Sequence, residues 1–182
     1  MLADLGIDPV AVTAALPPHM VTLLPESGLQ PAWAIALPAR LGVIQVLGRM
    51  LLFFLAHRFD LHLANRLIPC LIPLGLGALL ASGGQMALAL VFMLLYGMGN
   101  GMLTIVKGTA IAQYVSRAHV ASLNGALGLP TALARAAAPW MLGLLWSRET
   151  GYAYGLAVLL GMSVAAVLAL WIAQRRALAA AG

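Results

Sequence analysis

The chain has 182 residues, of which 63% are hydrophobic and 8% are charged, and its formal net charge is +5. A soluble domain carries about 25% charged residues, so this composition excludes a water-soluble fold and, with it, the soluble enzymes. The basic residues stand singly at the ends of apolar segments, without the basic face that nucleic-acid binding requires. We therefore expect no nucleic-acid partner.

The first two apolar segments differ in length. Residues 10–24 form an apolar run that Pro17-Pro18 interrupts. This run is short for a full crossing, so it predicts a partial or broken membrane helix. A loop follows at Pro25-Glu26-Ser27-Gly28. Because proline is favourable in the first turn of a helix, Pro31 marks the start of a transmembrane helix predicted over 31–56.

The longest uncharged stretch runs from Leu67 to Val106 and contains no Asp, Glu, Lys or Arg. One membrane crossing needs about 20 apolar residues, so this stretch is long enough for two helices. Ser82-Gly83-Gly84-Gln85 lies in its middle and is typical of a turn. The sequence therefore predicts transmembrane helices over 64–81 and 86–106, joined by a tight polar loop.

The last third of the chain predicts two more crossings. Residues 107–119 are mixed and indicate a loop, with a helical extension as the alternative. A helix is predicted over 120–146, and another over 152–173, which ends at Gln174-Arg175-Arg176. The expected fold is all-α: one polytopic membrane helix bundle over 1–182, with five transmembrane helices and one partial N-terminal helix.

The basic residues also predict an orientation. If the crossings alternate, one side of the membrane receives six basic residues: Arg58, Arg66, Lys107, Arg117, Arg175 and Arg176. The other side receives Glu26, the turn 82–85, and Arg148 with Glu149. Because positive loops face the cytoplasm, we expect the first side, and with it the C-terminus, to be cytoplasmic.

Arg40 is the sharpest candidate for a functional residue. It lies nine residues after Pro31, roughly 13 Å along the helix and close to the middle of the bilayer. A charge at that depth costs about 2.5–3.5 kcal/mol or more and usually marks a substrate or ion pathway. Two alternatives stay open: Arg40 reaches outward to the interface, or its helix begins later.

Arg135 is the second charged candidate, since it lies at mid-depth in the predicted helix 120–146 among alanines. It contacts either a substrate or coupling ion, or a polar group of a neighbouring helix. No acidic residue is expected inside the membrane to pair with Arg40 or Arg135. This favours an anionic substrate, or partner acids on another polypeptide.

Further candidates are uncharged or lie nearer the boundary. Gly97 and Gly101 allow close helix contact, and Asn100 beside them is a hydrogen-bond donor between helices or a ligand. Gln45 is a candidate for the substrate path. Arg49 shares a helix face with it near the inner boundary, where a salt-bridge or gating role and substrate contact are the open alternatives. Lys107 is a second inner-boundary candidate, where it complements a helix C-terminus.

The sequence contains few arrangements of residues that are typical of catalytic sites. The four histidines are dispersed, with no spacing typical of metal ligands, and no nucleotide-binding motif is present. Cys70 stands alone in an apolar helix, where a buried, unreactive role is expected. We therefore predict no catalytic residues, no metal site and no cofactor, and the chain is not expected to be an enzyme.

Three segments together carry a resemblance to a known family: Gly42–Arg49, Tyr96–Thr109 and Ala134–Pro139. They are similar to the C-terminal half of bacterial major facilitator superfamily (MFS) transporters. In this resemblance residues 10–24 are the remainder of the seventh helix, and the five predicted transmembrane helices are the eighth to the twelfth. The resemblance implies alternating access around a site between two halves, in the bacterial cytoplasmic (inner) membrane.

Two functional hypotheses follow. The first is a transporter half that moves a small, anionic solute, with Arg40, Gln45, Asn100 and Arg135 on the substrate path. Its partners would be the lipid bilayer, the small-molecule substrate, and an N-terminal transporter half or a second copy of the chain. The second is a truncated or non-transporting membrane interaction protein, which the partial first helix favours.

Overall fold

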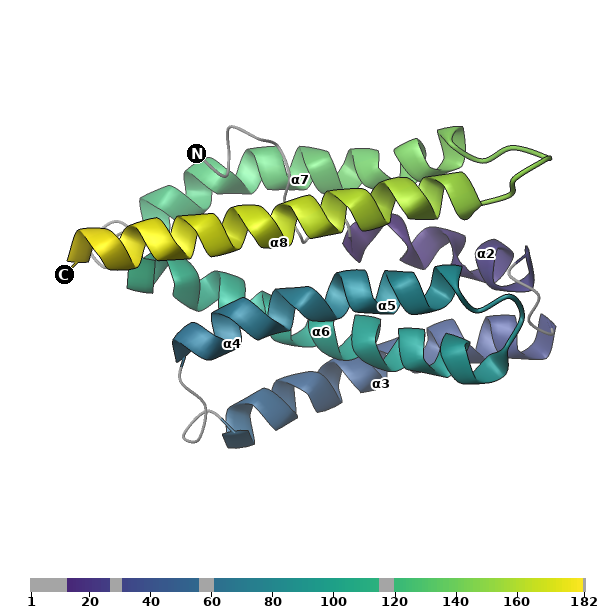
Figure 1. The fold of residues 1–182 in the computed structure, drawn as a ribbon, viewed down its shortest axis with the longest axis horizontal. Helices are drawn as coiled ribbons and strands as arrows, with labels where there is room; N and C mark the ends of the chain where they lie inside the picture. The colour runs from purple at the N-terminus through teal and green to yellow at the C-terminus, as the bar shows by residue number, and fades with distance from the viewer. Residues whose placement is uncertain (1–12, 27–30, 56–60, 115–119, 182) are drawn as a thin grey trace.

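A computed structural model describes residues 13–26, 31–55, 61–114 and 120–181, and these residues form helices joined by turns (Figure 1). No strand occurs in these ranges, so the expected all-α class is confirmed for them. The helices are α2 (Met20–Glu26), α3 (Pro31–Leu55), α4 (Leu61–Leu67), α5 (Leu71–Leu80), α6 (Met86–Tyr114), α7 (Val120–Leu144) and α8 (Ala153–Ala181), with short 3-10 turns η2 (Pro17–His19) and η3 (Ile68–Cys70).

The N-terminal helix is broken at its two prolines, as the sequence predicts. Residues 13–15 form a helical turn, the chain bends at Leu16, and η2 leads into α2. Proline has no N–H to donate, so Pro17 and Pro18 interrupt the regular helical pattern. Residues 10–12 of the predicted partial helix lie outside the described residues. Pro25 does not end the helix, which continues to Glu26 instead of giving way to a loop there.

The helix predicted over 64–81 is broken in the structure. It begins at Leu61 rather than Ala64 and consists of α4, η3 and α5. Because Pro69 cannot donate a backbone hydrogen bond, the helix tightens into η3. The carbonyl of Arg66 accepts hydrogen bonds from Trp171 Nε1 at 3.0 Å and from Cys70 Sγ at 3.3 Å. A side chain of α8 thus satisfies the backbone at the break.

The turn after α5 is confirmed, and the later helices differ from their predicted limits. Gly83 and Gly84 have φ of 48° and 87°, values that glycine adopts readily. α6 extends past Val106 to Tyr114, because 107–114 contains no proline to stop it, so the helical extension is the correct alternative there. α7 ends at Leu144 rather than 146. α8 passes Gln174-Arg175-Arg176, which are good helix formers, and ends at Ala181.

Four helices are long and apolar enough to cross a membrane: Ala36–Phe54, His62–Leu80, Met86–Val106 and Ala153–Arg176. They support an integral membrane protein. α7 is not among the four, although it is a helix of 25 residues. It contains Arg135, two prolines and polar residues, which lower its hydropathy. The expected total of five transmembrane helices therefore stays a prediction.

α6 is the central helix of the bundle. Buried residues make up 56% of its membrane window, the apolar range Met86–Val106, against 17% of the corresponding range Ala36–Phe54 in α3. It packs mainly against α3 and α5, and α5 packs against α8. Phe92 and Tyr96 of α6 are fully buried with ring centroids 5.3 Å apart, and the Tyr96 hydroxyl donates a hydrogen bond to the carbonyl of Thr13. The N-terminal segment is thus fixed to the core.

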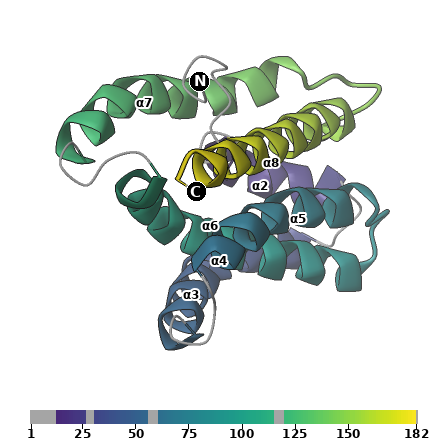
Figure 2. The same ribbon diagram turned by 60° about the vertical axis from the view of Figure 1, so that its left-hand side comes forward.

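The loops gather at two ends of the bundle. The end of α2, the α5–α6 turn and the α7–α8 loop lie at one end (Figure 1). At the other end, Gln174 Nε2 of α8 donates to the carbonyl of His62 on α4 at 3.0 Å. The alternation of predicted crossings assigned these two groups of segments to opposite sides of the membrane. α7 and α3 lie on opposite sides of the bundle in both views (Figure 2).

Candidate functional site

α3 and α6 cross at their glycines with backbones in close contact. A Cβ added to Gly48 would lie 2.9 Å from the carbonyl oxygen of Met98. A Cβ on Gly97 would lie 2.7 Å from Ile44 Cγ2, and one on Gly101 would overlap the carbonyl oxygen of Gln45. The small residues therefore serve helix contact, in the way that the spacing of Gly97 and Gly101 indicated.

The polar residues of α3 are spaced along its membrane window. Gln45 is the central residue of Ala36–Phe54 and is half-buried, with its carbonyl against Gly101. Arg40 lies five residues before it, roughly 7 Å toward the start of the window, and Arg49 four residues after it. The helix begins at Pro31 as expected, and its apolar window begins at Ala36, four residues before Arg40. Both arginines are exposed.

The two arginines of the predicted substrate path do not lie together in this chain. Arg40 is on α3 and Arg135, also exposed, is on α7 at the opposite side of the bundle (Figure 2). Asn100 is half-buried on α6, one residue before Gly101, so it lies near the α3–α6 crossing with Gln45. Lys107 is in α6, and its side chain lies outside the described residues. Within the described residues, none of Arg40, Arg49 and Arg135 forms a hydrogen bond or an ion pair.

A polar cluster that the sequence did not reveal joins α2, α7 and α8. His19 Nε2 lies 2.9 Å from the carbonyl oxygen of Pro139, and His19 Nδ1 lies 3.1 Å from the hydroxyl of Tyr152. Thr22 Oγ1 donates to the carbonyl of His19 at 2.9 Å and lies 3.1 Å from the same tyrosine hydroxyl. The His19 and Tyr152 rings are 5.6 Å apart.

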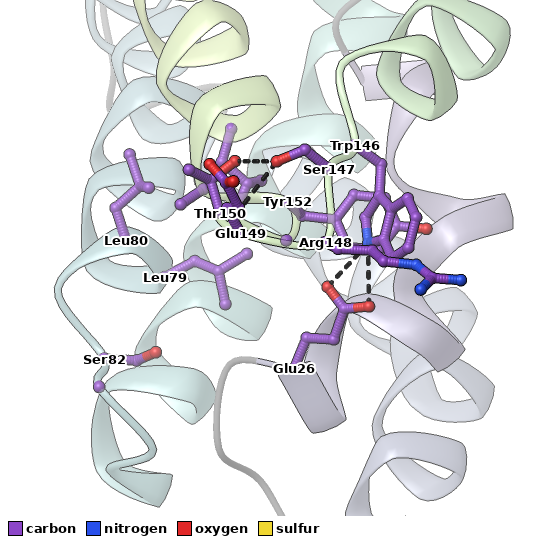
Figure 3. A pocket seen from close by; sticks show the side chains of 14 residues that line it. Glu26, Leu79, Leu80, Ser82, Trp146, Ser147, Arg148, Glu149, Thr150 and Tyr152 are labelled. Atoms are coloured by element: carbon purple, nitrogen blue, oxygen red, sulfur yellow. Dashed lines mark hydrogen bonds between the residues drawn. The ribbon is translucent and has the colours of Figure 1, made fainter.

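An open cleft of about 700 Å³ lies at the end of the bundle next to this cluster (Figure 3). The α7–α8 loop forms one wall, and Glu26, the α5–α6 turn and Tyr152 complete the lining. Trp146 Nε1 donates to both carboxylate oxygens of Glu26, at 3.0 and 3.2 Å. Glu149 and Arg148 are exposed at the rim, so the cleft contains two carboxylates and one guanidinium.

The loop that forms the cleft wall has its own hydrogen bonds. Ser147 and Thr150 join side chains at 2.7 Å, and the Thr150 N–H donates to Ser147 Oγ at 3.2 Å. Gly151 has a φ of 53°, and a Cβ there would lie 2.7 Å from a carboxylate oxygen of Glu26. The loop therefore presents a fixed surface to the end of α2.

Sequence reasoning set His19 aside because no other histidine stood at the spacing of a metal ligand. A usable signal was present, since His19 is an ionisable side chain that directly follows the Pro17-Pro18 break of an apolar segment. Its partners lie 120 and 133 residues away along the chain, so only the fold identifies them. The same holds for Glu26 and Trp146, which are 120 residues apart.

Comparison of the chain with models of protein families, with curated proteins and with solved structures found no match.

Proposed function

We propose that this chain is the C-terminal half of an MFS-type secondary transporter and moves a small, anionic solute by alternating access. The proposal is supported by the all-helical bundle with four helices suited to crossing a membrane. It is supported further by the backbone contact of α3 with α6, which correspond to the eighth and tenth helices in the resemblance to that family. In this reading the protein belongs to the bacterial inner membrane, with its C-terminus in the cytoplasm.

The observation that carries the proposal is the exposure of one arginine on α3 and another on α7. Arg40 lies within the membrane window of α3, and Arg135 lies three residues from the middle of α7. Neither has a partner among the described residues. A guanidinium in or near the hydrocarbon region is costly unless an anion or water contacts it. An anionic solute, or a carboxylate of a second transporter half, supplies that contact.

The separation of the two arginines indicates how a complete site would form. α3 and α7 lie on opposite sides of the bundle (Figure 2), so among the described residues Arg40 and Arg135 belong to separate faces. A second half packed against α3 or against α7 would cover the exposed apolar face of that helix and enclose a pathway beside it. The partner is an N-terminal transporter half or a second copy of this chain.

The test is uptake of labelled small anions by proteoliposomes that contain the chain alone or together with a candidate N-terminal half. We expect uptake only with the second half or in a self-associated form. Arg40→Gln and Arg135→Gln should each raise KM at least tenfold, because loss of a hydrogen bond to a charged group costs about 1.5–3 kcal/mol. Arg176→Gln is the control, since it removes one positive charge from an exposed position near the end of α8.

Two results would decide against this function. Uptake that persists unchanged when both arginines are neutralised would refute the assignment of the substrate path. Stable association with a second half, without uptake of any anion by the wild-type pair, would instead favour the non-transporting membrane interaction protein. The orientation is tested separately by thiol labelling of the single-cysteine variants Gln85→Cys and Arg176→Cys in a Cys70→Ala background, since both positions are exposed.

A further inference from the structure

α4 and the last turns of α8 meet at the end of the bundle opposite the cleft (Figure 1). Trp171 Nε1 of α8 donates to the carbonyl of Arg66 at 3.0 Å, and Gln174 Nε2 donates to the carbonyl of His62 at 3.0 Å. Residues three or four apart share a helix face. Trp171 and Gln174 therefore lie on one face of α8, and the two residues that accept their hydrogen bonds lie on one face of α4.

The side chain of Arg66 lies over the ring of Trp171, with Cζ 5.5 Å from the ring centroid. This cation–π contact holds the half-buried arginine against an aromatic face. Within the described residues its guanidinium forms no hydrogen bond or ion pair. A stacked guanidinium still presents N–H groups at its edge, in a fork that matches two oxygens of a phosphate. Arg66 is therefore positioned to bind such an anion.

The same end of the bundle is basic. Arg175 is exposed and lies four residues after Trp171, so it is on the same face of α8, one turn further along. α4 and α8 contain no Asp or Glu, and Asp60, which precedes α4, lies outside the described residues. The carboxylates among the described residues, Glu26 and Glu149, both line the cleft at the opposite end. The charges at the α4–α8 end therefore favour an anionic ligand.

Arg66 and Trp171 lie at matching depths in their apolar windows. Arg66 is four residues, roughly 6 Å, inside the window His62–Leu80, and Trp171 is five residues, roughly 7 Å, from the end of Ala153–Arg176. Tryptophan is typical of the membrane interface, and a charge at this depth is costly unless an anion or water contacts it. Because arginine extends its charged group toward the interface, a lipid phosphate is within its reach.

An exposed apolar strip leads away from the basic residues along α8. It consists of Val164, Leu168 and Ile172, which are spaced four apart and are followed by Arg175 three residues later. On α4, Leu67 is also exposed. A soluble anion would contact only the guanidinium groups, whereas a lipid would cover the strip as well. The combination favours a ligand with an anionic head and an apolar tail.

We propose that the α4–α8 end of the bundle is a binding site for an anionic phospholipid. The lipid phosphate lies between Arg66 and Arg175, and an acyl chain follows the apolar strip on α8. Basic pockets between transmembrane helices bind anionic lipid headgroups by this combination of charge and location. The inference rests on the chain being a membrane protein and is independent of transport.

The first measurement is quenching of Trp171 fluorescence by lipids with brominated acyl chains, in the full chain with Trp33→Phe, Trp140→Phe and Trp146→Phe. The vesicles are phosphatidylcholine with a minor fraction of phosphatidylglycerol, and the bromine is placed on one lipid or the other. A basic residue near anionic lipid contributes about a fivefold gain in affinity, so two arginines predict a preference of roughly 25-fold for phosphatidylglycerol. Brominated phosphatidylglycerol should therefore quench Trp171 far beyond its share of the lipid.

Arg66→Gln and Arg175→Gln should each lower this preference to about fivefold. Arg176→Gln is the matched control and should retain most of the preference, since Arg176 is exposed but lies off the face of Trp171. Arg148→Gln removes the same charge at the cleft end and should change nothing. Equal losses for Arg175→Gln and Arg176→Gln would show a general attraction of the basic end and would overturn the site.

Native mass spectrometry of the chain with all its tryptophans gives a reading that does not depend on the fluorescence background. We expect phosphatidylglycerol to remain bound where phosphatidylcholine is lost, and Arg66→Gln to abolish this difference. Inorganic phosphate should displace the lipid no more than chloride does at equal ionic strength. Specific displacement by phosphate would mean that a soluble anion is the ligand. Equal retention and equal quenching by the two lipids would refute the proposal.

Discussion

The indole of Trp146 donates its one N–H to both carboxylate oxygens of Glu26, at 3.0 and 3.2 Å, and so connects the α7–α8 loop to the end of α2. Both residues lie in the exposed lining of the cleft (Figure 3). Trp146 is a membrane-interface residue with an apolar body and one polar atom, which suits this position at the end of the bundle.

Replacing Trp146 by Phe removes this N–H and retains most of the apolar ring. We expect a loss of about 0.5–1 kcal/mol in the free energy of unfolding, because an exposed hydrogen bond contributes little. Cleavage of the α7–α8 loop by an added protease should also become faster. Trp140→Phe is the control, since Trp140 is exposed on α7 and has no hydrogen bond among the described residues. Equal effects of the two substitutions would exclude a role for Glu26.

Gly151 and Gly83 form a matched pair for testing the loop. Both have positive φ, 53° and 48°, so alanine at either position is strained by about 1–2 kcal/mol. A Cβ on Gly151 would meet a Glu26 oxygen at 2.7 Å, whereas a Cβ on Gly83 meets nothing within 4 Å. Gly151→Ala should therefore lower the melting temperature more than Gly83→Ala. The excess should vanish in a Glu26→Ala background, and an excess that persists there would contradict the contact.

Gly101→Ala should force α3 and α6 apart. Its Cβ would overlap the carbonyl of Gln45, which is backbone and cannot rotate away, so a cost of about 1–3 kcal/mol is expected in detergent-induced unfolding. Gly42→Ala on the facing helix meets nothing within 4 Å. It should be neutral or stabilising by up to about 1 kcal/mol, since alanine favours the helix. A Gly101→Ala variant as stable as Gly42→Ala would show that the helices do not touch there.

Tyr96→Phe tests how firmly the N-terminal segment is fixed to the core. The substitution leaves the carbonyl of Thr13 without its buried hydrogen-bond donor. We expect a loss of about 1–3 kcal/mol and faster hydrogen exchange in the segment before η2. Tyr154→Phe, at an exposed hydroxyl on α8, should change neither quantity. Unchanged exchange near Thr13 in the Tyr96 variant would argue against this attachment.

The helices and turns were largely predictable because their signals are local. Pro31 at a helix start and glycines at the turn 83–84 act through their own backbone, and the structure shows both. The ends of α6 and α8 were not predictable from polarity. Gln and Arg at 174–176 are polar and are also good helix formers, so the change in polarity that ends an apolar run does not end the helix.

The candidate site was predictable only in part. The close contact at Gly97 and Gly101 follows from residue size, which the sequence shows directly. The sequence does not determine whether the Arg40 side chain is buried, because that depends on which face of α3 meets α6. In the structure Arg40 is exposed. The polar cluster at His19 joins residues from both ends of the chain. No local periodicity or spacing in the sequence indicates contacts between residues so far apart.

The glycine crossing of α3 and α6 has a mechanical consequence. At Gly48 and Gly101 the backbones of the two helices touch, so no side chain lies between them at these two points that could re-pack. We expect α3 and α6 to move together as one rigid body in any rearrangement of the bundle. Among the described residues, α7 makes fewer contacts with the other helices than α6 does. We therefore expect α7 to move relative to α3 and α6, which stay fixed to each other.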